Sequence, residues 1–183
     1  MDVKRTGVVL KPNNSRVLFR PFEPATQERI LKIIARVMSV NDEQVSLLFA
    51  DVMREFQGRH QRLRDFFLER FDSVKGHLLT DETLSEERRL LIGAYFTNEY
   101  SLESAALFNP SMVWHPDQSG LSKGKRRFIL SLRATGEGHI SSITFRSGTV
   151  DADNRITIDQ PTRFVTTPHG PLRNERTDRK SVV

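Results

Sequence analysis

Residues 127–148 of the chain, RFILSLRATGEGHISSITFRSG, contain two runs of alternating apolar and polar residues on either side of a glycine-containing turn. This pattern is typical of two antiparallel β-strands joined by a tight connection. We therefore expect a β-hairpin with strands over residues 127–133 and 139–146, and with Gly136 and Gly138 in its turn.

Four side chains at the tip of this predicted hairpin have the chemistry of a binding site. Glu137 lies between the two turn glycines, and Arg133, His139 and Ser141 are close to it in the sequence. An acid, a cation, an imidazole and a hydroxyl together suit a polyhydroxylated or anionic ligand. The same residues also fit an ordinary solvated turn, so both interpretations stay open at this point.

The composition indicates a soluble protein with one domain of modest core and room for an extension. The chain has 183 residues, 37% of them hydrophobic, including 12 Phe, which is enough apolar material for a core. The net charge is +5, but charges alternate in sign over residues 62–70, as on a solvated helix face. The chain has no cysteine, which excludes disulfides and thiolate chemistry. It has no apolar run of membrane-spanning length and no signal-peptide pattern, so we expect a cytoplasmic location.

Helical signals dominate the chain upstream of Pro110. Thr26 and Asn41 are candidate N-caps, and Thr83 begins the capping box Thr-Leu-Ser-Glu. Apolar residues at helical spacing follow each of these caps. Gly58 is expected to bend or divide the long amphipathic helix that follows Asn41.

The pattern changes to strands downstream of Pro110. A short helix from Ser101 is expected to end at Asn109, because a proline disfavours helical backbone in the residue before it. Strands are expected near residues 112–114, 128–133, 139–145, 155–158 and 163–165. A pair of short strands is also expected within residues 6–20. Helices first and strands second indicate an α+β fold or two units.

The segment from Phe108 to Phe164 contains three motifs in an informative order: Asn-Pro-Ser at residues 109–111, then RFILSLRA, then GEGHISSITFRSG. Together they resemble the start of the catalytic domain of glycoside hydrolase family 130, the inverting β-mannoside phosphorylases and related β-mannosidases. The helical part, with LKPNNSRVLFRPFEP and RRLLIGAYFTNEYSLESAALFNPS, resembles the N-terminal extension of the longer members.

This resemblance implies a five-bladed β-propeller with a central polar site, of which the chain would hold only the opening part. Residues 1–108 would form an N-terminal strand pair and helical extension, residues 109–168 the first blade or blades, and residues 169–183 an unstructured tail. The last six residues, DRKSVV, match a translated sequencing-library adaptor. We therefore expect the end of the tail to be artefactual, the natural protein to be longer, and the fragment alone to be inactive.

The resemblance also assigns roles in a reaction on β-linked mannosides. It implies that Glu137 is the catalytic acid, where family members usually carry Asp, and that Asn109 and Arg133 contact the sugar or its phosphate partner. His139 falls where the family often has a basic residue, and Ser141 is assigned to substrate binding. The implied reaction inverts the sugar carbon and uses an oligosaccharide and inorganic phosphate, or water in some branches, without a cofactor.

Two other kinds of function stay open. The helical part is a candidate oligomerisation module, and we expect the full-length protein to be a homo-oligomer. The net positive charge is also compatible with a small nucleic-acid-binding protein, which we rank below the other two functions. No membrane partner is expected. His115 and Asp117 could suggest a metal, but two ligands around a proline favour an ordinary loop, so we assign no metal site.

Overall fold

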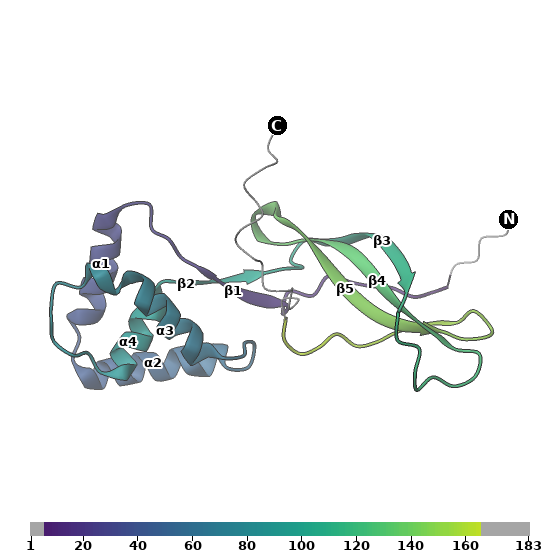
Figure 1. Ribbon diagram of the computed structural model, residues 1–183. Helices are drawn as coiled ribbons and strands as arrows, with labels where there is room; N and C mark the ends of the chain where they lie inside the picture. Colours follow the sequence, from purple (N-terminus) through teal and green to yellow (C-terminus); the bar gives the residue numbers. More distant parts are fainter. Residues whose placement is uncertain (1–5, 166–183) are drawn as a thin grey trace, which may run out of the picture.

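The computed structural model describes residues 6–165 and places a helical part and a sheet part end to end, connected by a two-stranded ribbon (Figure 1). The helices are α1 (Gln27–Met38), α2 (Asp42–Phe56), α3 (Leu63–Val74) and α4 (Glu86–Tyr95), with a short 3-10 helix at Lys75–His77. The strands are β1 (Val17–Pro21), β2 (Thr97–Ser101), β3 (Ala106–Trp114), β4 (Arg126–Thr135), β5 (Ser141–Val150) and β6 (Ile156–Ile158). A second 3-10 helix, Glu137–His139, connects β4 and β5.

Side-chain caps fix where the first two helices begin, as the sequence predicts. The side chains of Thr26 and Asn41 accept hydrogen bonds from the third residue after each of them. The cap of α4 is Ser85 rather than Thr83, because the Ser85 hydroxyl accepts the bond from the Arg88 backbone N–H. The predicted division near Gly58 is confirmed, since α2 ends before this residue and α3 begins after it.

The helices bury two apolar clusters, and α2, α3 and α4 contribute to both. One cluster packs α1 against the other three helices, and the second packs α2, α3 and α4 around Phe67 and Leu90, which are almost completely buried. At Gly93 the backbones of α3 and α4 touch, so that a Cβ on Gly93 would overlap the carbonyl oxygen of Phe67. The packing of α3 on α4 therefore depends on the absence of a side chain at this position.

A buried arginine joins α4 to the connection between α1 and α2. The guanidinium of Arg88 donates to the carbonyl oxygens of Val37 at 2.5 Å and Val40 at 2.8 Å, and to the Asp42 carboxylate at 2.8 Å. Carbonyls at the C-terminal end of a helix lack intrahelical partners, so a cation that binds them is favourable.

The sheet part is a four-stranded antiparallel sheet in the order β3-β4-β5-β6. The predicted hairpin is confirmed, because β4 and β5 pair without a register shift from Arg126 opposite Val150 to Thr135 opposite Ser141. One face, which we call the inner face, carries the buried residues Phe128, Leu132 and Ala134. The opposite, outer face carries Arg133, Ile143 and Phe145; the last two are exposed.

The ribbon pairs two segments that are far apart in the sequence. β1 pairs with β2 in antiparallel register, with Val17 opposite Ser101 and Pro21 opposite Thr97. The expected pairing of two strands within residues 6–20 is therefore not formed. In the sequence, all four helices lie between β1 and β2. Gly136 lies against this ribbon, since a Cβ there would overlap the Tyr100 hydroxyl and the Ser101 carbonyl oxygen.

A buried ionic cluster ties the ribbon to the sheet. Glu103, which is 0% exposed, accepts hydrogen bonds from Nη2 of Arg146 at 2.6 and 2.9 Å and from the Thr144 hydroxyl at 3.2 Å. Nε of Arg16 lies 3.0 Å from the same carboxylate. Burial, and then the neighbouring charge of Arg146, hold the pKa of Arg16 below its usual value, while Glu103 acts in the opposite direction.

Three secondary-structure predictions around these strands are wrong. The expected short helix from Ser101 is absent, because Ser101 ends β2 and β3 follows shortly after it. Asn109 does not end a helix and instead lies inside β3, at a register shift against β4. Residues 163–165 do not form a strand.

The predicted first blade or blades of a five-bladed β-propeller are also wrong. The described residues form four α-helices and two antiparallel sheets of two and four strands, and no propeller-like closure is seen among them. The sequence correctly predicts helices followed by antiparallel strands. However, β1 and β2 form their own sheet, and among residues 6–165 no further strand pairs with the outer edges of β3 and β6. The tail predicted for residues 169–183 lies outside the described residues.

None of the helices described within residues 6–165 has both the length and the apolar character required to cross a bilayer.

Candidate functional site

A hollow of about 470 Å³ at the tip of the β4–β5 hairpin brings together three of the five predicted site residues. Asn109 from β3, Arg133 from β4 and Ser141 from β5 line it. Its remaining lining residues are Ser131, Leu132, Ser142 and Ile143. The hollow is thus built by three neighbouring strands, and its lining combines five polar residues with the apolar Leu132 and Ile143.

Arg133 and Ser141 form the polar wall of this hollow. Nε and Nη2 of Arg133 donate to the Ser141 hydroxyl oxygen, at 3.1 and 2.9 Å. The guanidinium also lies over the ring of Phe108, 5.2 Å from its centroid. No carboxylate among the described residues pairs with Arg133, so its positive charge is available to an anion.

A β-bulge places Asn109 at the hollow. β3 and β4 are in register at Phe108 and again at Ser111, and between them β3 has one residue more than its partner. Asn109 takes left-handed backbone there, with φ 51°, which asparagine tolerates better than most residues. A bulge redirects a side chain, and Asn109 is among the residues that line the hollow.

Glu137 and His139, the other two predicted site residues, lie in the turn outside the hollow. Both are exposed and belong to the 3-10 helix between the strands, and neither is a lining residue. His139 has φ 59° and Gly138 φ 62°, so both residues of this tight turn take left-handed backbone. The structure therefore brings Asn109, Arg133 and Ser141 together and places Glu137 beside them without a shared cavity.

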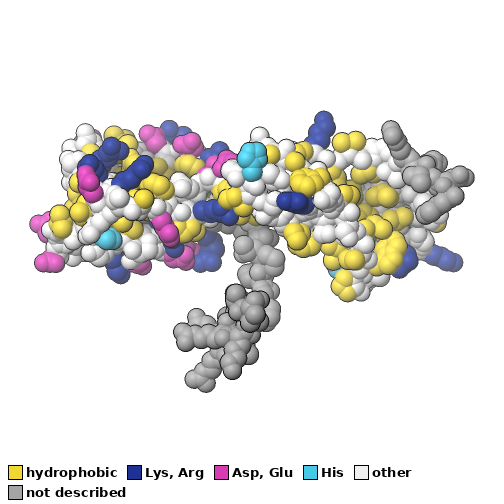
Figure 2. Space-filling model, turned by 90° about the horizontal axis from the view of Figure 1, so that it is seen from above, with side chains coloured by type: hydrophobic (Ala, Val, Ile, Leu, Met, Phe, Trp, Pro, Cys, Tyr) yellow, Lys and Arg dark blue, Asp and Glu magenta, His cyan; other side chains and the backbone are white. Residues whose placement is uncertain are grey.

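The outer face around the hollow is unusually apolar for an exposed surface. Val113, Ile143 and Phe145 are 60%, 68% and 56% exposed. Figure 2 shows hydrophobic side chains gathered over the sheet part, whereas charges of both signs are mixed over the helical part. Apolar side chains next to a few fixed polar groups are the usual composition of a small-molecule site.

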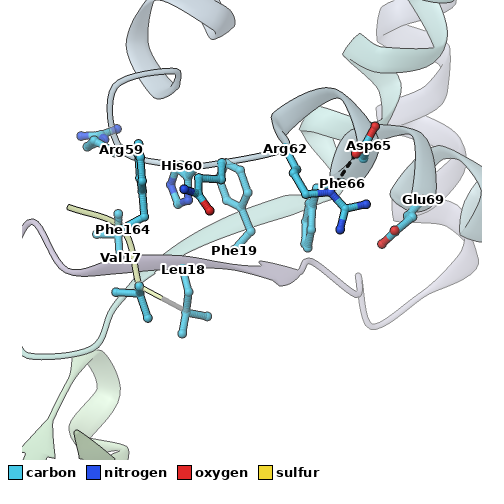
Figure 3. Close-up of a pocket in the computed structure, with 12 residues that line it drawn as sticks. Val17, Leu18, Phe19, Arg59, His60, Arg62, Asp65, Phe66, Glu69 and Phe164 are labelled. Atoms are coloured by element: carbon cyan, nitrogen blue, oxygen red, sulfur yellow. Dashed lines mark hydrogen bonds and ion pairs between the residues drawn. The ribbon is translucent and has the colours of Figure 1, made fainter. Parts of the chain in front are cut away.

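A second pocket, of about 290 Å³, lies where the helical part meets the ribbon (Figure 3). His60 stacks on Phe19 from β1, with ring centroids 3.6 Å apart, and its Nε2 lies 2.6 Å from the Glu99 carboxylate of β2. Arg62 reaches along the pocket toward Asp65, with 2.9 Å between Nε and the carboxylate. This pocket was not predicted from the sequence. Its one sequence signal is the helix break at Gly58, because the pocket residues Arg59, His60 and Arg62 lie in the connection between α2 and α3.

Burial lowers the pKa of His60, while its hydrogen bond and ion pair with Glu99 act in the opposite direction. Because its pKa is lower in the folded state, the unfolded state binds the proton more readily. The free energy of unfolding should therefore fall as the pH drops below about 6.5, the ordinary pKa of histidine. We expect His60→Gln to lose this part of the pH dependence, in urea titrations at about pH 7.5 and about pH 5.5. His139→Gln, at an exposed histidine, should retain it, and an unchanged dependence in His60→Gln would contradict the assignment.

His115 and Asp117 form a local turn. The Asp117 backbone N–H donates to Nδ1 of His115 at 3.0 Å, and Arg127 pairs with the Asp117 carboxylate at 3.4 Å. Within residues 6–165, no cluster of three or more His, Asp or Glu residues is placed to hold a metal ion.

Comparison of the chain with known protein families, curated proteins and solved structures gives no match. The resemblance to glycoside hydrolase family 130 therefore stays a prediction from the motifs, and any function must be argued from the geometry of the chain itself.

Proposed function

We propose that this chain is part of a carbohydrate-active enzyme that acts on β-linked mannosides, with inorganic phosphate as the second substrate. The observation that carries the proposal is the hollow in which Arg133, Ser141 and Asn109 meet. A guanidinium, a hydroxyl and an amide at one site are the groups needed to bind sugar hydroxyls and a phosphate. The sequence resemblance supplies the choice of mannosides.

The proposed reaction breaks the bond between the anomeric carbon and the glycosidic oxygen. A phosphate oxygen forms the new bond to that carbon from the opposite face of the ring, so the configuration is inverted and mannose 1-phosphate is formed. The departing oxygen needs a proton, because an alkoxide is a poor leaving group. Phosphate is already nucleophilic, so this reaction needs no second carboxylate as a base; hydrolysis would need one.

Arg133 is proposed to bind phosphate, because it carries positive charge at the wall of the hollow without a described carboxylate partner. Glu137 is the proposed proton donor. Its support is the resemblance, together with its place in the short turn between the strands that carry Arg133 and Ser141.

The binding half of this proposal can be tested on the chain as it is. We expect phosphate and a β-mannoside such as mannobiose to perturb the NMR signals of the hollow, and Arg133→Ala to weaken phosphate binding about tenfold or more. This corresponds to the loss of a charge-assisted interaction worth about 1.5 kcal/mol or more. The matched control is Arg155→Ala, since Arg155 is an exposed arginine beyond the opposite end of β5. Equal losses in both variants would contradict a site at Arg133.

The catalytic half requires the complete gene product wherever the coding sequence continues past these residues. We expect this protein to release mannose 1-phosphate from a β-mannoside in the presence of phosphate, and Glu137→Gln to abolish the release while phosphate still binds. Unchanged turnover in Glu137→Gln would overturn the role of Glu137, and the absence of any reaction with β-mannosides would overturn the proposed function.

A further inference from the structure

A group of positive charges lies at the end of the sheet that is opposite to the candidate site. Lys123, Lys125 and Arg126, which we call the basic cluster, fall at the end of the β3–β4 loop and the start of β4, and all three are exposed. Among the described residues, no carboxylate forms an ion pair with any of them. Several exposed cations of the helical part are paired instead, for example Lys32 with Glu28. The basic cluster is therefore a concentration of uncompensated charge.

Hydrogen bonds fix the loop that carries the basic cluster. The Gln118 side chain accepts from the backbone N–H of Arg127 at 2.8 Å and donates to its carbonyl oxygen at 2.9 Å. Nη1 of Arg127 in turn donates to the carbonyl oxygen of Asp117 at 2.9 Å. Gly124, with φ 84°, packs on the β5–β6 turn, since a Cβ there would lie 3.2 Å from Cβ of Ala152. The loop backbone is thus already ordered, which lowers the entropy cost of binding a ligand.

An exposed aromatic ring lies within the basic cluster. Trp114, the last residue of β3, is 42% exposed, and the guanidinium of Arg126 lies over its ring, 3.8 Å from the centroid. The register explains this contact, because Trp114 is opposite Phe128 and Arg126 is two residues before Phe128 on the same face of the sheet. Nucleic-acid bases stack on aromatic rings and also on guanidinium planes. The Arg126–Trp114 pair therefore has the chemistry of a stacking platform.

We propose that the basic cluster and Trp114 bind single-stranded nucleic acid. The three cations attract the phosphates of the strand, and an unpaired base presents a flat face to the Arg126–Trp114 pair. In a duplex the neighbouring base pairs cover these faces, so the pair would have nothing to stack on. Sulfated polysaccharides and anionic membranes also attract cations, but neither carries an aromatic base. The presence of a stacked pair beside the charges is what favours a single strand over these other polyanions.

The carboxylates beside the basic cluster weaken its field without cancelling it. Asp151 and Asp153 belong to the β5–β6 turn, which lies at the same end of the sheet as the β3–β4 loop (Figure 1). Asp151 accepts hydrogen bonds from the backbone N–H groups of Asp153 and Arg155, both at 2.9 Å. The cations of the cluster outnumber these two acids. We expect Asp153→Asn to strengthen binding, because this exposed carboxylate repels phosphate.

Trp114 is the only tryptophan of the chain, so its fluorescence reports directly on the proposed site. Titration of the full chain with a short oligothymidylate at low salt should quench this fluorescence. The slope of log K against log salt concentration should be about −2, as for three phosphates neutralised on a single strand. Lys123→Ala combined with Lys125→Ala should weaken binding about tenfold or more and make this slope shallower by about 1.4. The matched control, Lys32→Ala with Arg36→Ala, removes two exposed cations of α1 and should change neither quantity.

Arg126→Lys separates stacking from charge, because lysine keeps the positive charge but has no planar guanidinium. We expect this variant to bind about fivefold more weakly or worse, with an unchanged salt slope, in anisotropy measurements on a labelled oligothymidylate. Circular dichroism verifies that each variant keeps its fold. A wild-type chain that does not bind the oligonucleotide at low salt would overturn the proposal. So would equal affinity for heparin or for a DNA duplex of the same length, or an equal loss in the α1 control. The inference is independent of the proposed enzymatic function, since it concerns the other end of the sheet and its readout is binding.

Discussion

Gly93→Ala should destabilise the helical part by about 3 kcal/mol or more. The new Cβ would overlap the carbonyl oxygen of Phe67 and would lie 2.7 Å from its carbonyl carbon. Both atoms belong to the α3 backbone, so no rotamer change can relieve the overlap, and the two helices must separate. In an exposed helix the same substitution normally stabilises by about 1 kcal/mol, so the sign of the effect is itself diagnostic.

Urea unfolding monitored by the helical circular dichroism signal measures this loss. Gly58→Ala is the matched control, because no atom lies within 4 Å of a Cβ built at that glycine. Its effect should stay within about 1 kcal/mol in either direction. If Gly93→Ala proved as stable as Gly58→Ala, α3 and α4 would not be in the close contact described above.

Glu103→Gln should have the second large effect, with an expected loss of about 3 to 5 kcal/mol. The substitution preserves size but removes the only negative charge of the described buried cluster around Arg16 and Arg146. Two buried guanidinium groups would then face each other without a counter-charge. Because Glu103 lies between β2 and β3, we expect the contact between the sheet and the ribbon to lose stability before the helical part does.

Trp114 makes this prediction measurable. It is the only tryptophan of the chain and lies in β3, so its fluorescence reports on the sheet, while circular dichroism at the helical band reports mainly on the helices. We expect the fluorescence transition of Glu103→Gln to move to lower urea. Glu55→Gln, at an exposed glutamate, should leave both transitions in place.

Replacing Arg16, Glu103 and Arg146 together by apolar residues should recover part of the loss, since a complete apolar substitution leaves no unpaired charge. A fluorescence transition unchanged in Glu103→Gln would show that the cluster does not hold the sheet.

Local signals in the sequence predict local structure well in this chain. The caps at Thr26 and Asn41 and the glycine-containing turn of the hairpin each act over a few residues, and each appears where expected. The pairing of β1 with β2 was missed because its two strands are separated by the whole helical part, and short alternating runs do not reveal their partners. The propeller was wrong for a related reason: the order of strand motifs does not determine how a sheet closes.

Only the part of the candidate site that depends on the pairing of β4 with β5 could be predicted from the sequence. Arg133 and Ser141 come together because β4 and β5 pair as expected, whereas Asn109 joins them through a bulge that the sequence does not indicate. Glu137 was placed in the site by resemblance, and the structure leaves it in the exposed turn. The burial of Glu103 was missed as well, because a glutamate in a short connection carries no sign of the two arginines that meet it.

The pairing of Pro21 with Thr97 has a consequence for the modularity of the chain. The chain leaves β1 at Pro21 and returns to β2 at Thr97, and these two residues are paired. The four helices between them are therefore, in topological terms, the loop of a β-hairpin. Such a module can be lengthened, shortened or exchanged without rethreading the strands on the other side. A two-residue turn grafted between β1 and β2 would give a shorter chain with the ribbon and the four-stranded sheet, in which the hollow beside Arg133 could be studied without the helices.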